Sequence, residues 1–403
     1  MIFCFVLPLE IPVGSISQKP IDLVMSDFVF VITSFLMMLY LLLNKPMVLT
    51  SNIKFVVFII FVYVFEGMFH ALFLLIDSSD IMPLVSSIRF YKPMLFLIIG
   101  VFIAHCEKKF IVNFDTNMIF ATLIVSILLI VSTCIDSGFP NSLWGRSILF
   151  CDVYGFPNAS MSFFAFLSLF LLAQYLRTKS ILYGTVYVFL ALNIVLSLSR
   201  SSTIVLIIGT VILVTFFRSA KQVILYVAIT FLCVVSVLFV LKDLPEFENT
   251  FELVNDRIQR TLGNTENDAT SGRIQIWKET IHIIMDKPLF GYGFEPFSNF
   301  LVDYDTPHQQ YLEVLYKTGI IGFFMYSFIV LFMLRYLYIK YKKQHNNDAL
   351  FVTVRVMFSG LIALSIGNFT QPNFSYAVLG NLLFFMFGVV LVSEYKLKKV
   401  ILE

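Results

Sequence analysis

Apolar residues fill long stretches of the chain, and polar residues gather in the short segments between them. A helix rises 1.5 Å per residue, so roughly 17 to 22 apolar residues cross the hydrocarbon core of a bilayer. The opening stretch, residues 1–13, is too short for this and is broken by Pro8 and Pro12, so it is either a truncated first span or a re-entrant piece. We therefore expect an all-α polytopic membrane protein with about 11 or 12 spans. The eleven clear ones lie near residues 27–43, 55–76, 83–104, 118–135, 159–176, 181–198, 203–217, 222–241, 319–337, 350–369 and 377–393.

One segment, residues 242–318, is long and polar enough to form a large element outside the membrane. Within it, residues 271–286 have the period of an amphipathic helix, because Ile281 and Ile284 follow Ile274 and Trp277 on one predicted face. Lys287-Pro288 ends this helix, and Gly291-Tyr292-Gly293 predicts a turn. The chain thus divides into N-terminal spans (1–241), a partly helical loop (242–318) and C-terminal spans (319–403).

The end of this loop has the signals of a second helix start. Thr306 can cap the helix, Pro307 suits the first helical position, and Gln309 completes a capping box. This interpretation puts His308 in the first turn of the helix that enters the next span.

Composition supports the membrane assignment and excludes several classes of protein. The 403 residues are 59% hydrophobic and 13% charged, whereas soluble proteins have about 25% charged residues. A soluble enzyme, a disordered scaffold and a nucleic-acid binder are therefore excluded. The five cysteines are scattered and fit small apolar fillers better than disulfides or metal ligands. No cleavable signal peptide is recognisable, so we expect the first spans to direct insertion.

Lysine and arginine predict the orientation. They concentrate in alternate connections and at the C-terminus, which the positive-inside rule makes cytoplasmic. Segments 77–93, 136–158 and 242–318, and the turn that contains Arg200, then face outward. The cytoplasmic set is Lys45, Lys54, Lys108, Lys109, Arg177, Lys179, Arg218, Lys221, Lys340, Lys342, Lys343, Lys396, Lys398 and Lys399.

Four polar residues on the predicted outer side have distinctive contexts. Arg146 follows Trp144-Gly145, Arg200 lies in a serine-rich turn between two spans, Arg273 opens the amphipathic helix, and His308 opens the next one. A guanidinium group is always charged and binds phosphate oxygens with two parallel hydrogen bonds. Three such groups at the membrane surface would suit a pyrophosphate, although each arginine alone could be an interfacial anchor.

His308 is the best candidate for a general base. An ordinary histidine has a pKa near 6.5, so it is mostly neutral at pH 7 and can accept the proton of an attacking hydroxyl. The other histidines have weaker cases. His70 lies one helical turn after Glu66, where we favour a structural pair over a proton relay.

These segments resemble the O-antigen ligase/polymerase family of bacterial inner-membrane glycosyltransferases. The similarity runs through Gly145-Arg146, Gly155-Phe156-Pro157-Asn158 and Ser199-Arg200 to Ser271-Gly272-Arg273, Trp277, Pro288 and Gly291-Tyr292-Gly293. It ends with Pro307-His308, Tyr311-Leu312 and Gly319-Ile320-Ile321-Gly322.

The resemblance implies a donor glycan on undecaprenyl pyrophosphate, used at the periplasmic face. Arg146, Arg200 and Arg273 would bind the pyrophosphate, and His308 would activate the acceptor hydroxyl. The implied reaction is an inverting, metal-independent glycosyl transfer without a cofactor. Gln309 stands where the family usually has Asn or Ser; with Trp277, Tyr311 and Arg89 it is expected to support the site. Asp303 and Asp305, on either side of Tyr304, keep a metal-assisted variant open.

The acceptor distinguishes two activities. A polymerase joins two lipid-linked repeat units, whereas a ligase transfers the polymer to the phosphorylated lipid A core. Residues 242–318 contain seven Lys/Arg and thirteen Asp/Glu, and such an acidic loop favours a weakly charged acceptor, hence a polymerase. A lipid-linked glycan flippase is a further alternative. Expected partners are the bilayer, the lipid-linked glycan, the second glycan or lipid A core, and a chain-length regulator, with no nucleic acid.

Overall fold

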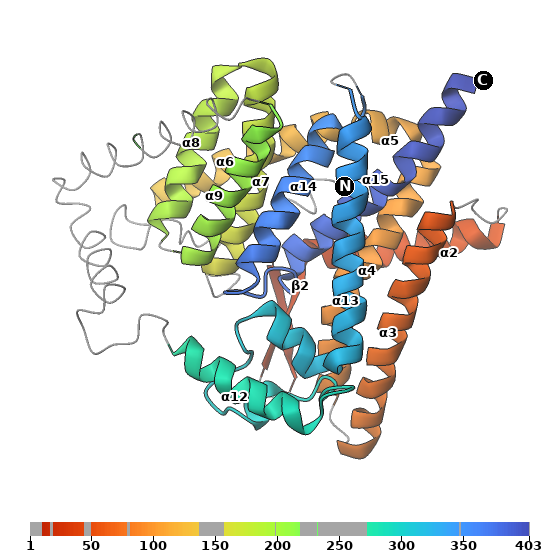
Figure 1. The fold of residues 1–403 in the computed structure, drawn as a ribbon, viewed down its shortest axis with the longest axis vertical. Helices are drawn as coiled ribbons and strands as arrows, with labels where there is room; N and C mark the ends of the chain where they lie inside the picture. The colour runs from red at the N-terminus through yellow and green to blue at the C-terminus, as the bar shows by residue number, and fades with distance from the viewer. Residues whose placement is uncertain are drawn as a thin grey trace. The chain divides into compact units, whose positions relative to one another are not determined.

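A computed structural model describes residues 10–16, 19–43, 50–78, 81–136, 157–197, 199–217, 232, 272–345 and 348–402. Nearly all of these residues are helical (Figure 1). The helices of the first half of the chain are α2 (Met25–Leu43), α3 (Ser51–Ser78), α4 (Met82–Cys106), α5 (Lys108–Val112), α6 (Phe114–Asp136), α7 (Pro157–Thr178), α8 (Ile181–Leu196) and α9 (Arg200–Thr215). They are followed by α12 (Arg273–Asp286), a 3-10 turn η3 (Phe297–Asn299), α13 (Gln310–Lys343), α14 (Phe351–Gly367) and α15 (Ala377–Leu402).

The predicted spans coincide with these helices. Every predicted span has a helix at its position except 222–241, which lies outside the described residues apart from residue 232. Among the described residues, four helices are long and apolar enough to cross a membrane by themselves: Ile53–Ile76, Met82–Cys106, Asn158–Thr178 and Gln310–Lys343. Six shorter apolar helices accompany them. The fold class, an all-α polytopic membrane protein, is therefore confirmed.

The start of the chain differs from the prediction. Residues 10–16 belong to a strand, β1 (Glu10–Ile16), which pairs antiparallel with β2 (Lys19–Val24). The prediction of a truncated span or re-entrant piece is therefore wrong for this part, while residues 1–9 lie outside the description. Pro12 has no backbone N–H group and therefore disfavours helix. A two-stranded hairpin can accommodate it, because each strand pairs along one edge only.

The described chain divides into two compact units. The first contains residues 1–115, 276–357 and 368–403, and the second contains residues 116–275 and 358–367. In the first unit, α4 and α15 approach closely because Gly100 and Gly388 face each other; a Cβ atom at Gly100 would lie 2.2 Å from the carbonyl oxygen of Phe385. Small residues at helix crossings are what close packing in a membrane requires. In the second unit, α7 packs beside α8 and α9 (Figure 1).

A buried carboxylate fixes the start of α14. Asp115 accepts hydrogen bonds from the backbone N–H groups of Val352 and Thr353, at 2.8 and 2.9 Å. It therefore satisfies donors that a helix N-terminus leaves without partners, and its negative charge suits the helix dipole there.

Helix α13 bends sharply at Gly319, whose φ of 61° is left-handed. The turn Gly291-Tyr292-Gly293 docks into this bend. The N–H groups of Ile320 and Ile321 donate to the carbonyl oxygens of Pro288 and Leu289, at 2.8 and 3.2 Å. The backbone bonds that the bend frees are thus satisfied by the preceding loop, which explains why both segments need glycine.

Candidate functional site

The chain before α13 is held in place by α12. Trp277 donates a hydrogen bond from its indole Nε1 to the carbonyl oxygen of Pro307, at 3.1 Å. Pro307 is buried, and the next residue, His308, is half-buried. A side chain predicted to support the site therefore acts through the backbone next to the candidate base.

The helix starts later than the sequence predicted. Helix α13 begins at Gln310, and its cap is Gln309, whose side-chain oxygen accepts the N–H of Leu312 at 2.5 Å. The prediction that Thr306 caps the helix and that His308 lies in its first turn is therefore wrong. Gln309 supports the helix start, as expected, although as the cap itself.

A tight turn replaces that first helical turn. His308 adopts a φ of 53°, and its N–H donates to Thr306 Oγ1 at 3.3 Å. The same hydroxyl lies 3.5 Å from His308 Nδ1. A positive φ is costly for a residue with a side chain, so the surrounding contacts must hold it, as is common at functional sites.

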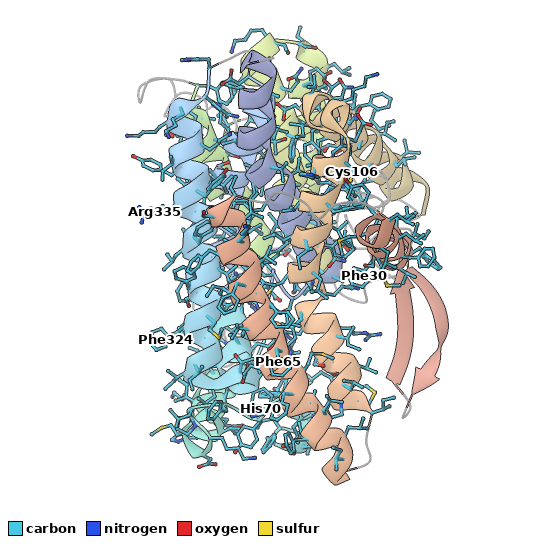
Figure 2. All side chains as sticks on the ribbon, turned by 90° about the vertical axis from the view of Figure 1, so that its right-hand side faces the viewer. Phe30, Phe65, His70, Cys106, Phe324 and Arg335 are labelled. Carbon is cyan, nitrogen blue, oxygen red and sulfur yellow. The ribbon has the colours of Figure 1, made fainter. Side chains whose placement is uncertain are left out.

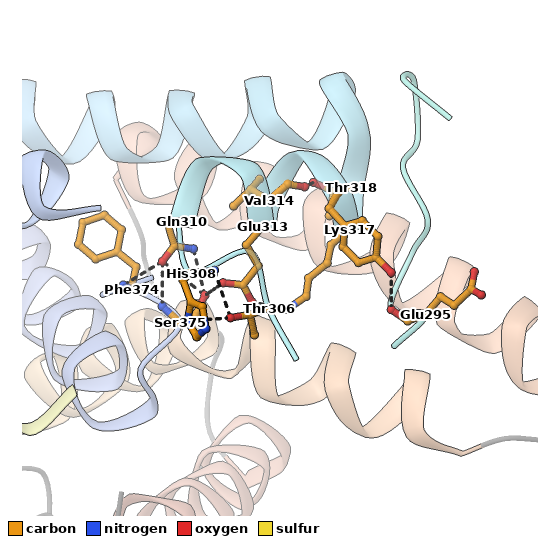
Figure 3. A network of polar contacts seen from close by, with 11 residues as sticks. Glu295, Thr306, His308, Gln310, Glu313, Val314, Lys317, Thr318, Phe374 and Ser375 are labelled. Atoms are coloured by element: carbon orange, nitrogen blue, oxygen red, sulfur yellow. Dashed lines mark hydrogen bonds and ion pairs between the residues drawn. The ribbon is translucent and has the colours of Figure 1, made fainter. Parts of the chain in front are cut away.

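Gln310 anchors this turn to the connection between α14 and α15 (Figure 3). Its side-chain oxygen accepts the N–H groups of Phe374 and Ser375 at 3.0 and 3.1 Å, and its Nε2 donates to Ser375 Oγ at 3.0 Å. Its own N–H donates to the carbonyl oxygen of Asn368 at 3.0 Å. Gln310 is buried, so these bonds replace the water that its amide would otherwise require.

A buried ion pair extends the network along α13 (Figure 3). Glu313 accepts a hydrogen bond from Ser375 Oγ at 3.1 Å and pairs with Lys317, one turn later. Lys317 also lies over the rings of Phe90 and Phe294, with Nζ 4.8 and 5.7 Å from their centroids. The pair and the two rings compensate for burying the charges.

Sequence reasoning missed Gln310, Glu313, Lys317 and Ser375. The spacing of Glu313 and Lys317, four residues apart, is the signal that could have revealed the ion pair. Nothing local in the sequence links Gln310 to Ser375, because 65 residues separate them.

The amphipathic helix exists with a different buried face from the one predicted. In α12, Ile276, Thr280 and Ile284 are buried, whereas Ile274 and Ile281 are about half exposed. Ile276 and Ile284 pack in one cluster with Phe297 and Tyr316. Isoleucine occurs on two faces of this helix, and the aromatic cluster decides which face is buried. Thr280 is accommodated because its hydroxyl donates to the carbonyl oxygen of Ile276, at 2.6 Å.

Tyr292 joins this cluster to α13. Its N–H donates to the carbonyl oxygen of Tyr316 at 2.8 Å, and the two rings stack with centroids 5.6 Å apart. Partial burial, followed by the carboxylates of Asp286 and Glu295, raises the pKa of Tyr292 above its ordinary value.

Of the three arginines, Arg200 has the best-defined surroundings, and they lie in the second unit. It is exposed and opens α9, directly after Ser199. Ser199 Oγ donates to Asn158 Oδ1 at 2.8 Å and lies 2.7 Å from Ser202 Oγ. The starts of α7 and α9 are therefore joined beside Arg200.

The remaining predicted residues are placed as follows. Arg146 lies outside the described residues. Arg273 is the first residue of α12, four residues before Trp277 and thus on the same helix face. Arg89 is exposed on α4, and Tyr311 packs on Phe369 with ring centroids 4.8 Å apart. The structure therefore brings Trp277, Gln309 and Tyr311 to the segment around His308. It places Arg89 on another helix of that unit and Arg200 in the other unit.

Metal-ligand clusters are absent from the part of the chain that the structure describes, where no three His, Cys, Asp or Glu side chains converge. Asp303 and Asp305, the acidic pair left open by the sequence, are both exposed. The ordered polar groups of the site are instead amide, hydroxyl, imidazole and the Glu313–Lys317 pair.

A family model described as O-antigen ligase matches residues 185–327. This segment matches the O-antigen ligase family. For this segment, the family expected from the motifs is thereby confirmed. The O-antigen ligase match covers most of α8, all of α9 and α12, and α13 as far as Ser327, so it includes Arg200, Arg273 and His308. It supports an O-antigen ligase- or polymerase-type function in general.

A relative from Haemophilus influenzae is described as an uncharacterized protein. It is 26% identical over 137 residues, which cover 30% of this chain and 33% of the relative. The match therefore spans about a third of that protein's length and carries no activity of its own.

Proposed function

We propose that this chain is an O-antigen polymerase of the bacterial inner membrane. It joins repeat units carried on undecaprenyl pyrophosphate at the periplasmic face, and its C-terminus is cytoplasmic. The observation that carries the proposal is the placement of His308. It lies in a strained turn fixed by Trp277 and Gln310, within the segment that matches the O-antigen ligase family.

The chemistry follows from the groups at the site. The acceptor hydroxyl oxygen attacks the anomeric carbon of the donor, and the bond from that carbon to the pyrophosphate oxygen breaks. His308 takes the hydroxyl proton, and the bonding electrons leave with undecaprenyl pyrophosphate. Attack opposite the leaving group inverts the anomeric configuration. A positioned base contributes about 10² to 10⁴ to the rate.

The three arginines serve the leaving group. Arg146, Arg200 and Arg273 would bind the pyrophosphate oxygens and stabilise the negative charge that develops as the glycosidic bond breaks. The hydrogen bond between Ser199 and Asn158 supports the assignment of Arg200, because it orders the turn that contains this arginine. Trp277 connects the helix that Arg273 opens to the backbone beside His308.

Surface charge favours polymerase over ligase. On the segment that carries the site, Asp286, Asp303 and Asp305 are exposed together with Lys278 and Lys287, and the acidic balance comes from residues 242–318 as a whole, with seven Lys/Arg and thirteen Asp/Glu. An acidic surface repels the phosphorylated lipid A core and tolerates a weakly charged repeat unit. A chain-length regulator would act on the same polymerising protein.

The test is the lipopolysaccharide gel of a deletion strain complemented with each variant. Loss of a polymerase leaves core with a single repeat, and His308→Ala should reproduce this at normal protein level. Bare core with full-length polymer on undecaprenyl pyrophosphate would identify a ligase instead. Donor accumulating in the cytoplasmic leaflet would identify a flippase, and an unchanged ladder would remove all three functions.

A further inference from the structure

Helix α3 carries a ladder of phenylalanines on one exposed face, which we call the aromatic ladder: Phe61, Phe65, Phe69 and Phe73. Successive ring centroids lie 6.2, 6.1 and 4.7 Å apart. All four side chains are exposed in the first unit. Residues four apart share a helix face, so the ladder is continuous over about 18 Å. Figure 2 shows Phe65 and His70 along this helix.

The ladder ends at a cavity of about 420 Å³. The cavity is lined by His70, Phe73 and Leu74 of α3 and by residues 287–293, the loop that docks on α13. Phe73 therefore belongs both to the ladder and to the cavity wall. An apolar track along a membrane-spanning helix leads directly into a space with polar groups.

Lys287 gives the cavity a positive charge. It is exposed, and its Nζ lies 4.4 Å from the centroid of the Tyr292 ring. His70 adds an imidazole, which meets the ring of Phe290 edge to face at 5.8 Å and lies 3.9 Å from Glu66. Lysine binds phosphate as a point charge, and the aromatic groups around it favour the membrane–water interface.

The cavity adjoins the candidate site through Tyr292, whose backbone bonds to Tyr316 of α13. Tyr316 lies six residues after Gln310, or about 9 Å along the helix. A headgroup held in the cavity would thus lie at the same end of α3 as the loop that carries His308.

We propose that the aromatic ladder and the cavity bind the lipid of the acceptor, a polyprenyl pyrophosphate chain, for which undecaprenyl phosphate is the binding probe. The isoprenoid tail lies along the ladder, and the phosphate nearest to the tail lies against Lys287 and His70. This inference rests on the proposed polymerase function, because joining two lipid-linked units requires a second lipid site besides the arginines. The match of an apolar track to a long chain and of a cation to its anionic head carries the assignment.

Lipid binding tests this directly. The purified protein carries Arg200→Ala and Arg273→Ala, which remove proposed donor contacts, and is titrated with undecaprenyl phosphate or phosphatidylglycerol. Bound lipid is counted by native mass spectrometry. We expect a preference for undecaprenyl phosphate, about fivefold weaker binding in Lys287→Gln, and about tenfold weaker binding in Phe65→Ala/Phe69→Ala.

Phe324 is the matched control. It is a phenylalanine of α13 that is 67% exposed, against 61% for Phe65, and it lies off the ladder (Figure 2). Phe324→Ala should leave binding unchanged. Equal affinity for both lipids, or an equal loss in Phe324→Ala and the ladder variant, would overturn the proposal and leave an ordinary lipid-facing surface. Lys287→Gln, at an exposed position, provides the result if the double variant does not fold.

Kinetics separate this inference from the proposed function. In the otherwise unchanged protein, Lys287→Gln should raise the KM for the acceptor while the KM for the donor stays constant. Polymer formation with normal lipid binding in every ladder variant would reject the ladder and keep the function. Selective, ladder-dependent lipid binding by a protein that makes no polymer would keep the lipid-binding inference and reject the polymerase function.

Discussion

The indole of Trp277 donates a hydrogen bond to the carbonyl oxygen of Pro307, at 3.1 Å. This bond connects α12 to the residue just before His308. Because the acceptor is a backbone carbonyl group, the bond restricts the backbone next to His308. It therefore restricts the direction in which the His308 side chain projects. The amphipathic helix is thus a positioning element for the candidate base as well as part of an apolar cluster.

Replacing Trp277 with Phe should separate positioning from folding. The change removes the N–H donor and keeps an aromatic ring, so the free energy of unfolding should fall by only about 1 kcal/mol. The transfer rate should fall about tenfold or more, because small displacements of a catalytic group are costly. Rate and melting temperature are measured on the same preparation, with the exposed Ile281→Ala as control. An unchanged rate would show that the bond does not position His308.

The Glu313–Lys317 pair predicts strong coupling between two substitutions. Lys317→Met leaves the buried Glu313 carboxylate without its cation and should cost about 3 kcal/mol of stability. Adding Glu313→Gln should recover much of that loss, because no unpaired charge remains. Thermal unfolding of the single and double variants in detergent measures the coupling. Simple additivity of the two effects would mean that the pair contributes nothing.

Gly319 should tolerate no side chain. A Cβ atom there would lie 2.3 Å from the carbonyl oxygen of Leu289, and its φ is 61°. Gly319→Ala should therefore cost about 2 kcal/mol or more and loosen the loop that docks in the bend. Gly184→Ala is the control, since no positive φ occurs there. Equal melting temperatures for the two variants would contradict the role of the bend.

Asn158 should affect donor binding through Arg200. Asn158→Ala removes the acceptor of the Ser199 hydroxyl, whose bond joins the starts of α7 and α9. We expect the KM for the donor to rise about fivefold, from the loss of one hydrogen bond that orders the turn. Ser180 caps α8 without a side-chain hydrogen bond, so Ser180→Ala is the control. A donor KM that is equal in the two variants would show that this hydrogen bond does not affect donor binding through Arg200.

The sequence predicted well whatever depends on local pattern. Apolar length located the helices, and Lys287-Pro288 and the two glycines around Tyr292 marked the end of α12 and the turn after it. The O-antigen ligase family of residues 185–327 was identified from short motifs, whereas the catalytic role of His308 stays a prediction.

It failed where distant contacts decide between local alternatives. Thr306 and Gln309 can both cap a helix, and the bonds of Gln310 to the connection before α15 accompany the later start. Isoleucine lies on two faces of α12, and the cluster around Tyr316 selects the face with Ile276. Such choices depend on residues tens of positions away, which periodicity does not reveal.

The most direct measurement is glycosyl transfer by the purified protein, with an undecaprenyl-pyrophosphate-linked repeat unit as both donor and acceptor. The product should be a polymer whose new linkage has inverted anomeric configuration. The rate should be at least about 10² lower in His308→Ala and unchanged in His282→Ala, an exposed histidine of α12. Retained configuration, or full activity of His308→Ala, would contradict the proposed chemistry.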